Sequence, residues 1–484
     1  MYGLTNVTAM FVGFFLMPLY TGLFSVSDYG AIELITIINQ VIVLIAGLQV
    51  ESGVARYYYE CKNDFERKKL ISSGLLLKLI VPAVFCLILL PWIEEISLAL
   101  FNSTLYKRAL LISLFTIPVS TIWGYFLLLF RLQMAKKIYV FLATGTTIIM
   151  FLCCIYFVAY LHLGIEGVFG GYFLSYIIFA VIGFGLSRKS FAFTFSLPLT
   201  KYMLAYSVPI IPATLVSWLR QYIDRFLLIP LVGLHGIGLY SAAMKVSSII
   251  LLVITAFQLA WLPFSMSLIT KEGHKEVFSK IFTYFVILLS LAALIVTIFS
   301  KEILQLLTPA TYWDAYILIG FLAGSFVLNG AFIFVSIGLS IVKKTYLNTV
   351  SFLGGTTLGI VFLFILTPRI GIIGAAIAAL ASSAITLIIG YFLAQRNYYI
   401  NYEWKKVVII FLAFLVFIPV TITINKNITG AMNIIIKLFE VIIFLMCIFK
   451  SLPKEEISDA FSLIKRKIKS LVLSFNVKYK EMKQ

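Results

Sequence analysis

Residues 138–160 read IYVFLATGTTIIMFLCCIYFVAY, a stretch that contains no charged side chain. A helix needs roughly 20 mostly apolar residues to cross the hydrocarbon core of a bilayer, so this stretch is long enough to span a membrane. Thirteen more runs of similar character lie on either side, at about 4–23, 30–50, 70–92, 108–130, 165–186, 203–231, 238–265, 277–299, 312–340, 346–367, 371–394, 406–424 and 431–449. The sequence therefore predicts an all-α polytopic membrane protein with about 14 transmembrane helices.

The composition agrees with a chain made mainly of membrane spans. Hydrophobic residues make up 62% and charged residues 12% of the 484 residues, whereas a soluble domain is about half apolar and a quarter charged. The three histidines lie in predicted loops without metal-site spacing, and the chain contains neither a Walker sequence nor a nucleophile elbow. We therefore expect a transporter rather than an enzyme, with no metal and no cofactor.

The formal net charge of +18 reflects the predicted topology. Of the 38 lysines and arginines, 28 fall in the loops after even-numbered spans or in the tail, and five fall in the opposite loops. Basic residues accumulate in cytoplasmic loops. This asymmetry predicts that both termini are cytoplasmic, and it removes the reason to invoke a nucleic-acid partner.

An internal repeat divides the chain. Lys136-Lys137-Ile138-Tyr139 recurs as Lys343-Lys344-Thr345-Tyr346, and Gly164-Ile165-Glu166-Gly167 recurs as Gly371-Ile372-Ile373-Gly374, both 207 residues later. This offset covers six spans, so the two copies have the same orientation in the membrane. We predict a six-helix lobe at 1–200, a second at 201–396, two additional helices at 397–450, and a basic amphipathic cytoplasmic tail at 451–484.

The seventh predicted span carries an unusual polar face. Arg220, Gln221, Asp224 and Arg225 lie on one side of this helix, while apolar residues occupy the other. A charged side chain at mid-bilayer costs roughly 2.5–3.5 kcal/mol on insertion scales. Three charges on one helix therefore indicate a hydrated cavity. The structural alternative is a local Arg220–Asp224 pair that only holds helices together.

Other polar residues inside spans are weaker candidates for the same cavity. Lys78 and Lys245 each lie about two turns inside a span, where a lysine either lines a cavity or extends to the membrane surface. Glu33 belongs to a polar stripe in the second span, and Ser325 and Asn329 belong to one in the tenth. Such stripes are either cavity wall or helix packing. Lys437, also inside a span, has no assigned role.

A cavity with an excess of arginine and lysine suits a phosphate-bearing substrate. Guanidinium groups bind phosphate oxygens through charge-assisted, often bidentate, hydrogen bonds. The excess positive charge indicates that the substrate is anionic.

Several segments resemble a known family. They are Pro18-Leu19-Tyr20 with Asp28-Tyr29-Gly30 near the amino terminus, and Tyr206-Ser-Val-Pro209-Ile-Ile-Pro212, Asp224-Arg225-Phe226, Gly238-Leu-Tyr240-Ser-Ala-Ala243 and Ala260-Trp261-Leu-Pro263-Phe264 in the centre. Together they are similar to the signature of the Wzx-type polysaccharide flippases, which handle O-antigen and capsule repeat units. These proteins belong to the multidrug/oligosaccharidyl-lipid/polysaccharide (MOP) exporter superfamily.

The resemblance implies a MATE-like, V-shaped pair of lobes in the bacterial inner membrane. Its substrate would be a polyprenyl-diphosphate-linked oligosaccharide, moved from the cytoplasmic to the periplasmic leaflet by alternating access. Carried over to this chain, Arg220, Asp224 and Arg225 would face the cavity, and we add Gln221, Lys78 and Lys245 as candidate substrate contacts. The protein would act as a monomer beside a polysaccharide polymerase.

The energy source is open at this stage. Glu33, Glu51 and Asp224 are the candidate titrating groups for coupling to H⁺ or Na⁺, and the membrane potential is the other candidate.

Three other functions fit parts of the pattern. A cation-coupled multidrug exporter of the same superfamily would use acidic residues for cationic drugs, and a lipid II-type peptidoglycan-precursor flippase would share the cationic cavity. A membrane-embedded polysaccharide polymerase would normally have a large extracytoplasmic loop, whereas the longest such loop predicted here is 92–107.

Overall fold

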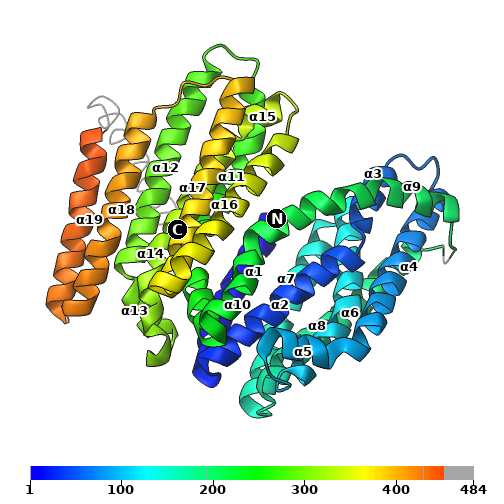
Figure 1. The fold of residues 1–484 in the computed structure, drawn as a ribbon. Coiled ribbons are helices and arrows are strands. Elements are labelled where there is room, and N and C mark those ends of the chain that lie inside the picture. The colour runs from blue at the N-terminus through cyan, green and yellow to red at the C-terminus, as the bar shows by residue number, and fades with distance from the viewer. Residues whose placement is uncertain (1, 193, 429, 452–484) are drawn as a thin grey trace, which may run out of the picture.

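The computed structural model describes residues 2–192, 194–428 and 430–451, and all regular elements in this part of the chain are helices (Figure 1). The predicted amphipathic tail therefore lies, apart from Ser451, outside the described residues. The principal helices are α1 Tyr2–Leu23, α2 Val26–Ala46, α3 Val50–Tyr58, α4 Asp64–Leu89, α5 Ile93–Phe101, α6 Lys107–Leu132, α7 Lys136–Ile155, α8 Gly164–Ser187, α9 Leu197–Ser207, α10 Ile211–Ser247, α11 Ile250–Leu268, α12 His274–Ile298, α13 Ser300–Leu307, α14 Tyr316–Val335, α15 Ile337–Ile341, α16 Tyr346–Ile370, α17 Ile372–Asn397, α18 Trp404–Asn427 and α19 Ala431–Ser451.

The predicted fold class is confirmed. Within the described residues, 13 helices are long and apolar enough to cross a membrane, and they correspond one for one to the second to fourteenth predicted spans. The first predicted span is the helix α1, of which Val12–Leu23 forms a shorter apolar segment.

Local sequence signals explain where the helices begin and break. Asn63 caps α4 by accepting a hydrogen bond from the Glu66 backbone N–H at 2.8 Å, as a helix amino terminus favours. Gly233 has φ 63° inside α10, and this residue separates the seventh span from the eighth. α10 therefore continues from the seventh predicted span into the start of the eighth, which α11 completes, where the sequence suggested a loop.

Backbone turns recur with the spacing of the sequence repeat. Gly164 and Gly371, 207 residues apart, have φ 62° and 64°, and each precedes a long helix. Met134 and Lys343, close to the same spacing, have φ 57° and 60°. These matching turns favour the division into two lobes that the sequence suggests.

Two groups of helices diverge from a shared base in Figure 1, where α2 to α9 lie on one side and α11 to α19 on the other. α10 packs against α2 of the first group and against α14 and α16 of the second. The groups separate toward the end of the molecule where α3 and α9 of the first group and α15 of the second lie.

The base is a backbone-to-backbone contact between α2 and the second half of α10. An added Cβ at Gly30 would lie 2.4 Å from the Leu234 carbonyl oxygen, and one at Gly238 would lie 2.0 Å from the Val26 carbonyl oxygen. Gly30 and Gly238 occupy corresponding positions of the repeat. Close approach of two helices requires such glycines.

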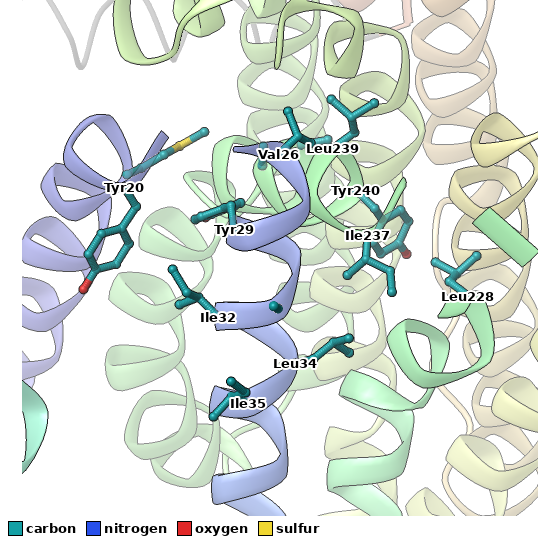
Figure 2. Close-up of a cluster of buried hydrophobic side chains, with 14 of the residues drawn as sticks. Tyr20, Val26, Tyr29, Ile32, Leu34, Ile35, Leu228, Ile237, Leu239 and Tyr240 are labelled. Atoms are coloured by element: carbon teal, nitrogen blue, oxygen red, sulfur yellow. The ribbon is translucent and has the colours of Figure 1, made fainter. Parts of the chain in front are cut away.

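Apolar side chains surround this crossing (Figure 2). Tyr29 and Ile32 of α2 and Ile237 and Tyr240 of α10 are all 2% exposed or less and belong to one buried cluster. Tyr312 donates a hydrogen bond to the Ser25 carbonyl oxygen at 3.2 Å, which ties the 310–315 turn to the start of α2. The end of the molecule near residues 25–30 is therefore tightly closed.

Candidate functional site

A cavity of about 380 Å³ lies above this closed base, and we call it the central cavity. Its wall is formed by α10, α14, α16 and α17, by one residue each of α2 and α11, and by Ser248 between α10 and α11. Six of the eight candidate residues from the sequence line it: Glu33, Arg220, Gln221, Asp224, Arg225 and Lys245.

Arg220 reaches across the cavity to the opposite wall. Its Nη1 donates to Asn329 Oδ1 of α14 at 2.9 Å, and its guanidinium carbon lies 4.5 Å from the centre of the Phe352 ring of α16. Its Nε has no hydrogen-bond partner among the described residues. A neutral amide and an aromatic face hold the guanidinium in place and leave its charge uncompensated.

Asp224 is occupied by its neighbours and forms no pair with Arg220 in the described structure. The carboxylate accepts from Arg225 Nη1 at 2.9 Å and from the Tyr240 hydroxyl at 2.7 Å. Arg225 is 7% exposed, and its Nη1 also donates to the Gln221 carbonyl oxygen at 2.5 Å. The structural alternative, a local Arg220–Asp224 pair, is therefore not formed, and Asp224 pairs with Arg225 instead.

Lys245 adds a second uncompensated cation. Its Nζ lies 3.1 Å from the Cβ position of Gly13 in α1, and the lysine forms no ion pair within the described residues. Glu33 approaches from α2 and is close enough to Arg225 to interact electrostatically. The central cavity thus has three cations and two carboxylates, and one of these carboxylates, Asp224, is already paired with Arg225.

Small uncharged polar groups form the wall opposite α10. They come from α14, α16 and α17, and Asn329 Nδ2 donates to Ser383 Oγ at 3.3 Å. The group consists of Ser325, Asn329, Thr356, Ser382, Ser383 and Thr386. This wall offers hydroxyl and amide groups, which donate and accept hydrogen bonds without carrying charge. Sequence reasoning found Ser325 and Asn329 but missed the others. The signal for three of the missed residues is the close spacing of Ser382, Ser383 and Thr386 in an Ala- and Ile-rich helix.

Lys78 and Glu51 lie elsewhere, in the first lobe. The Lys78 ammonium pairs with the Glu51 carboxylate between α4 and α3, and Lys78 is 2% exposed. Gln49, which has φ 50° at the start of α3, donates to Thr214 Oγ1 of α10 at 3.5 Å. The structure therefore places both residues in a structural ion pair beside the break between α2 and α3.

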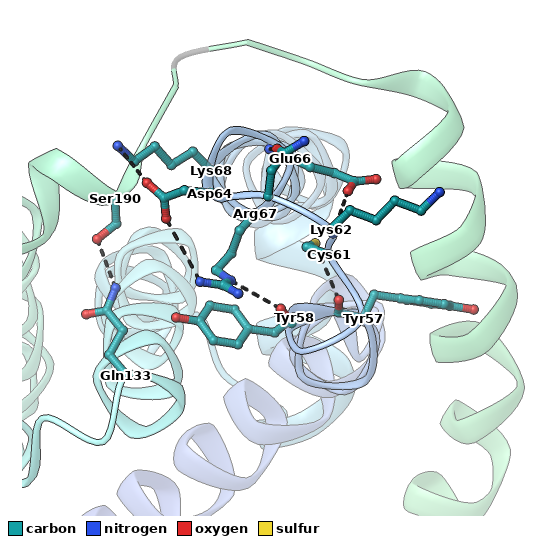
Figure 3. Close-up of polar contacts among 11 residues, drawn as sticks. Tyr57, Tyr58, Cys61, Lys62, Asp64, Glu66, Arg67, Lys68, Gln133 and Ser190 are labelled. Atoms are coloured by element: carbon teal, nitrogen blue, oxygen red, sulfur yellow. Dashed lines mark hydrogen bonds and ion pairs between the residues drawn. The ribbon is translucent and has the colours of Figure 1, made fainter.

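A second, smaller cavity of about 210 Å³ lies at the start of α4 (Figure 3). Asp64 pairs there with Lys68 at 3.3 Å and with Arg67 at 3.9 Å, and all three side chains are at least 35% exposed. Exposed pairs of this kind contribute little to stability. Within the described residues, no cluster of histidine, cysteine or acidic residues could hold a metal ion.

Comparison with protein families identifies the chain. Residues 1–269 match the profile of the family described as polysaccharide biosynthesis protein, which is more than half of the sequence. The chain belongs to this family. No curated protein sequence matches it.

Solved structures of transporters share the fold of this polysaccharide biosynthesis protein family member. The lipid II flippase MurJ in an inward closed conformation aligns with a TM-score of 0.72 at 15% identity, over 92% of this chain and 98% of MurJ. An inward-facing multidrug resistance MATE family transporter of the MOP superfamily aligns with a TM-score of 0.66 at 14% identity, covering 81% and 94%. An outward-facing MATE family transporter aligns with a TM-score of 0.58 at 14% identity, over 81% of this chain and 94% of the transporter.

Proposed function

We propose that this protein is a flippase that moves a polyprenyl-diphosphate-linked oligosaccharide from the cytoplasmic to the periplasmic leaflet of the bacterial inner membrane. The observation that carries the proposal is the pair of uncompensated cations, Arg220 and Lys245, in a cavity enclosed by membrane-spanning helices. A charge without a counter-ion is costly in a membrane. An anionic substrate group would supply the missing counter-charge.

The two walls of the central cavity suit the two parts of such a headgroup. Arg220 and Lys245 would hold the diphosphate, because ammonium and guanidinium groups bind phosphate oxygens. The uncharged wall around Asn329 and Ser383 would accept sugar hydroxyls. The polyprenyl tail is apolar and can stay in lipid while the headgroup crosses.

Alternating access would operate about the closed base. Basic loop residues predict that the diverging end faces the cytoplasm, so the described state is open toward the side where the substrate is made. Export then requires the Gly30–Gly238 contact to separate.

Transport would be driven by H⁺, by Na⁺ or by the membrane potential. Of the three candidate carboxylates, Glu33 lines the central cavity within hydrogen-bonding reach of the Tyr29 hydroxyl and forms no ion pair within the described residues. Asp224 is held by Arg225 and Tyr240, and Glu51 by Lys78. Glu33 is therefore the strongest candidate. The transporter would act as a monomer that passes its product to a polysaccharide polymerase.

A peptidoglycan-precursor flippase is the second candidate, because the fold likeness to the lipid II flippase MurJ extends over 92% of this chain. Both substrates present a lipid-linked diphosphate to the same cations. A cationic drug fits the cavity less well, because the charges lining it are in positive excess.

A deletion strain tests the proposed function. Completed lipid-linked repeat units should accumulate on the cytoplasmic leaflet, and wild-type protein should relieve the accumulation. Arg220→Ala with Lys245→Ala should fail to relieve it at normal membrane levels, whereas Lys136→Ala, which removes an exposed cation at the start of α7, should succeed. Repeat units that reach the periplasmic leaflet normally in the deletion strain would exclude the proposal, and accumulated peptidoglycan precursor would favour the second candidate.

A further inference from the structure

The helix pair α18–α19 contains a buried row of polar side chains, which we call the polar ladder. Its members are 5% exposed or less and lie outside the central cavity: Thr421, Asn425, Asn433, Lys437 and Glu440. At one end, Asn433 Nδ2 donates to the Ile428 carbonyl oxygen at 2.7 Å. At the other end, the Thr421 hydroxyl donates to the Glu440 carboxyl group, with oxygen separations of 3.2 and 3.3 Å.

The ladder meets water through α13. Lys437 Nζ donates to both carboxylate oxygens of Glu302, at 2.5 and 2.7 Å, and the Glu302 side chain is 37% exposed. Lys301 Nζ donates to the Asn425 carbonyl oxygen at 2.7 Å. The α13 end of the ladder is therefore charged, paired and accessible, while the Glu440 end is enclosed.

Glu440 has little support for a negative charge. Within the described residues its only hydrogen-bond donor is the Thr421 hydroxyl, and it is 3% exposed. Lys437, one turn earlier, is the charged group that acts on it, but this lysine is held by Glu302. A buried carboxyl group with one neutral donor favours its protonated form.

The other charged groups on the packed helices lie near the helix ends. α13 contributes Lys301 and Glu302, and α19 carries Lys450 in its last turn. α12 and α18 carry theirs in the first two turns or, for Lys426, in the last turn: His274, Lys275, Glu276, Lys280, Lys405, Lys406 and Lys426. Asn425 Nδ2, Asn425 Oδ1 and Asn433 Oδ1 are buried without partners in the described structure. These free polar atoms belong to residues that follow Thr421 on α18 or precede Glu440 on α19, on the side of the ladder that contacts α13.

We propose that Glu440 is a proton-binding site that is loaded from the α13 end along the polar ladder. With the proton bound, Glu440 is neutral and Lys437 remains with Glu302. When the proton leaves, the Glu440 anion competes for Lys437 and weakens the tie between α19 and α13. The site is separate from the central cavity and does not depend on the identity of the transported substrate.

Labelling with an apolar carbodiimide tests the site, because this reagent attacks protonated carboxyl groups in apolar surroundings. Full-length protein in lipid nanodiscs is treated between about pH 5 and about pH 9 and mapped by mass spectrometry. We expect label on Glu440 that falls about tenfold per pH unit once the site deprotonates. Glu302, an ion-paired carboxylate, should stay unlabelled in the same sample.

Two variants and a comparison of salts test whether the label on Glu440 reports proton binding. Thr421→Val removes the donor to the anion, so labelling should persist to higher pH, and Glu440→Gln should abolish it. The proposal is overturned if Glu440 stays unlabelled across this range while the urea-denatured protein is labelled there. It is also overturned if sodium chloride, but not choline chloride, suppresses the label at constant pH, because the ligand would then be a metal cation.

Discussion

Replacing Gly238 by alanine should open the closed base and shift the protein away from the described state. The added methyl group would lie 2.0 Å from the Val26 carbonyl oxygen, whereas ordinary contacts begin near 3.4 Å. α2 and α10 must therefore separate by about 1.4 Å, the difference between these two distances. Both partners are backbone, so a side-chain rotation cannot relieve the clash.

The cost of this overpacking is about 1–3 kcal/mol. The contact joins the two lobes and would be lost when the base opens, so the penalty falls on the closed-base state alone. A change of 1–3 kcal/mol shifts an equilibrium between two conformations by about 5- to 150-fold. The variant should populate the opposite state, in which the diverging ends come together.

Distances between spin labels measure this shift. Glu60 and Lys271 are exposed near the ends of α3 and α11, on opposite groups of helices. In a background without the five native cysteines, labels at Glu60→Cys and Lys271→Cys should move closer together in Gly238→Ala. Gly185→Ala is the matched control, since nothing lies within 4 Å of its Cβ position. An unchanged distance in a folded Gly238→Ala protein would refute the role given to the glycine crossing.

Three further predictions concern individual contacts. Arg220→Lys should recover only part of the transport lost in Arg220→Ala, because a lysine cannot both bond Asn329 and stack on Phe352. A transport rate of Arg220→Lys equal to that of wild type in a vesicle assay would contradict this. Glu51→Gln should lower the unfolding free energy by about 3 kcal/mol by leaving Lys78 buried and unpaired, and adding Lys78→Met should restore part of it; additive losses in thermal unfolding would argue against the pair. Burial, reinforced by the Asp28 carboxylate, raises the pKa of Tyr106 to about 12, so the neutral phenol stabilises the fold below about pH 10 and this contribution is lost toward about pH 12. Wild type should accordingly lose more thermal stability than Tyr106→Phe between about pH 9 and about pH 11, and parallel losses would exclude the effect.

The spans and the charged helix were predictable because each depends on local sequence. A continuous apolar run such as 138–160 satisfies its backbone hydrogen bonds in a membrane by forming a helix, and the structure forms it as α7 and the short π-helix Tyr156–Tyr160 that follows. The polar face of α10 follows from helical spacing alone, and it lines the central cavity.

Pairing between distant residues was not predictable. Lys78 and Lys245 look alike in the sequence, each two turns inside a span, but Lys78 meets Glu51 while Lys245 meets α1. Asp224 could have paired with Arg220 by spacing, and the position of Tyr240 after the Gly233 break decides in favour of Arg225. Such choices depend on which helices become neighbours, information that no single segment contains.

Flipping of a synthetic substrate by the purified protein tests the central claim most directly. The protein is reconstituted in vesicles with a fluorescent polyprenyl-diphosphate oligosaccharide, and transfer between leaflets is followed with a membrane-impermeant quencher. We predict transfer far above that of protein-free vesicles, reduced at least about tenfold in Arg220→Ala with Lys245→Ala, because a hydrogen bond to a charged group contributes about 1.5–3 kcal/mol. Wild-type rates in this double variant, or equal transfer of a lipid-linked oligosaccharide that lacks the diphosphate, would contradict the account.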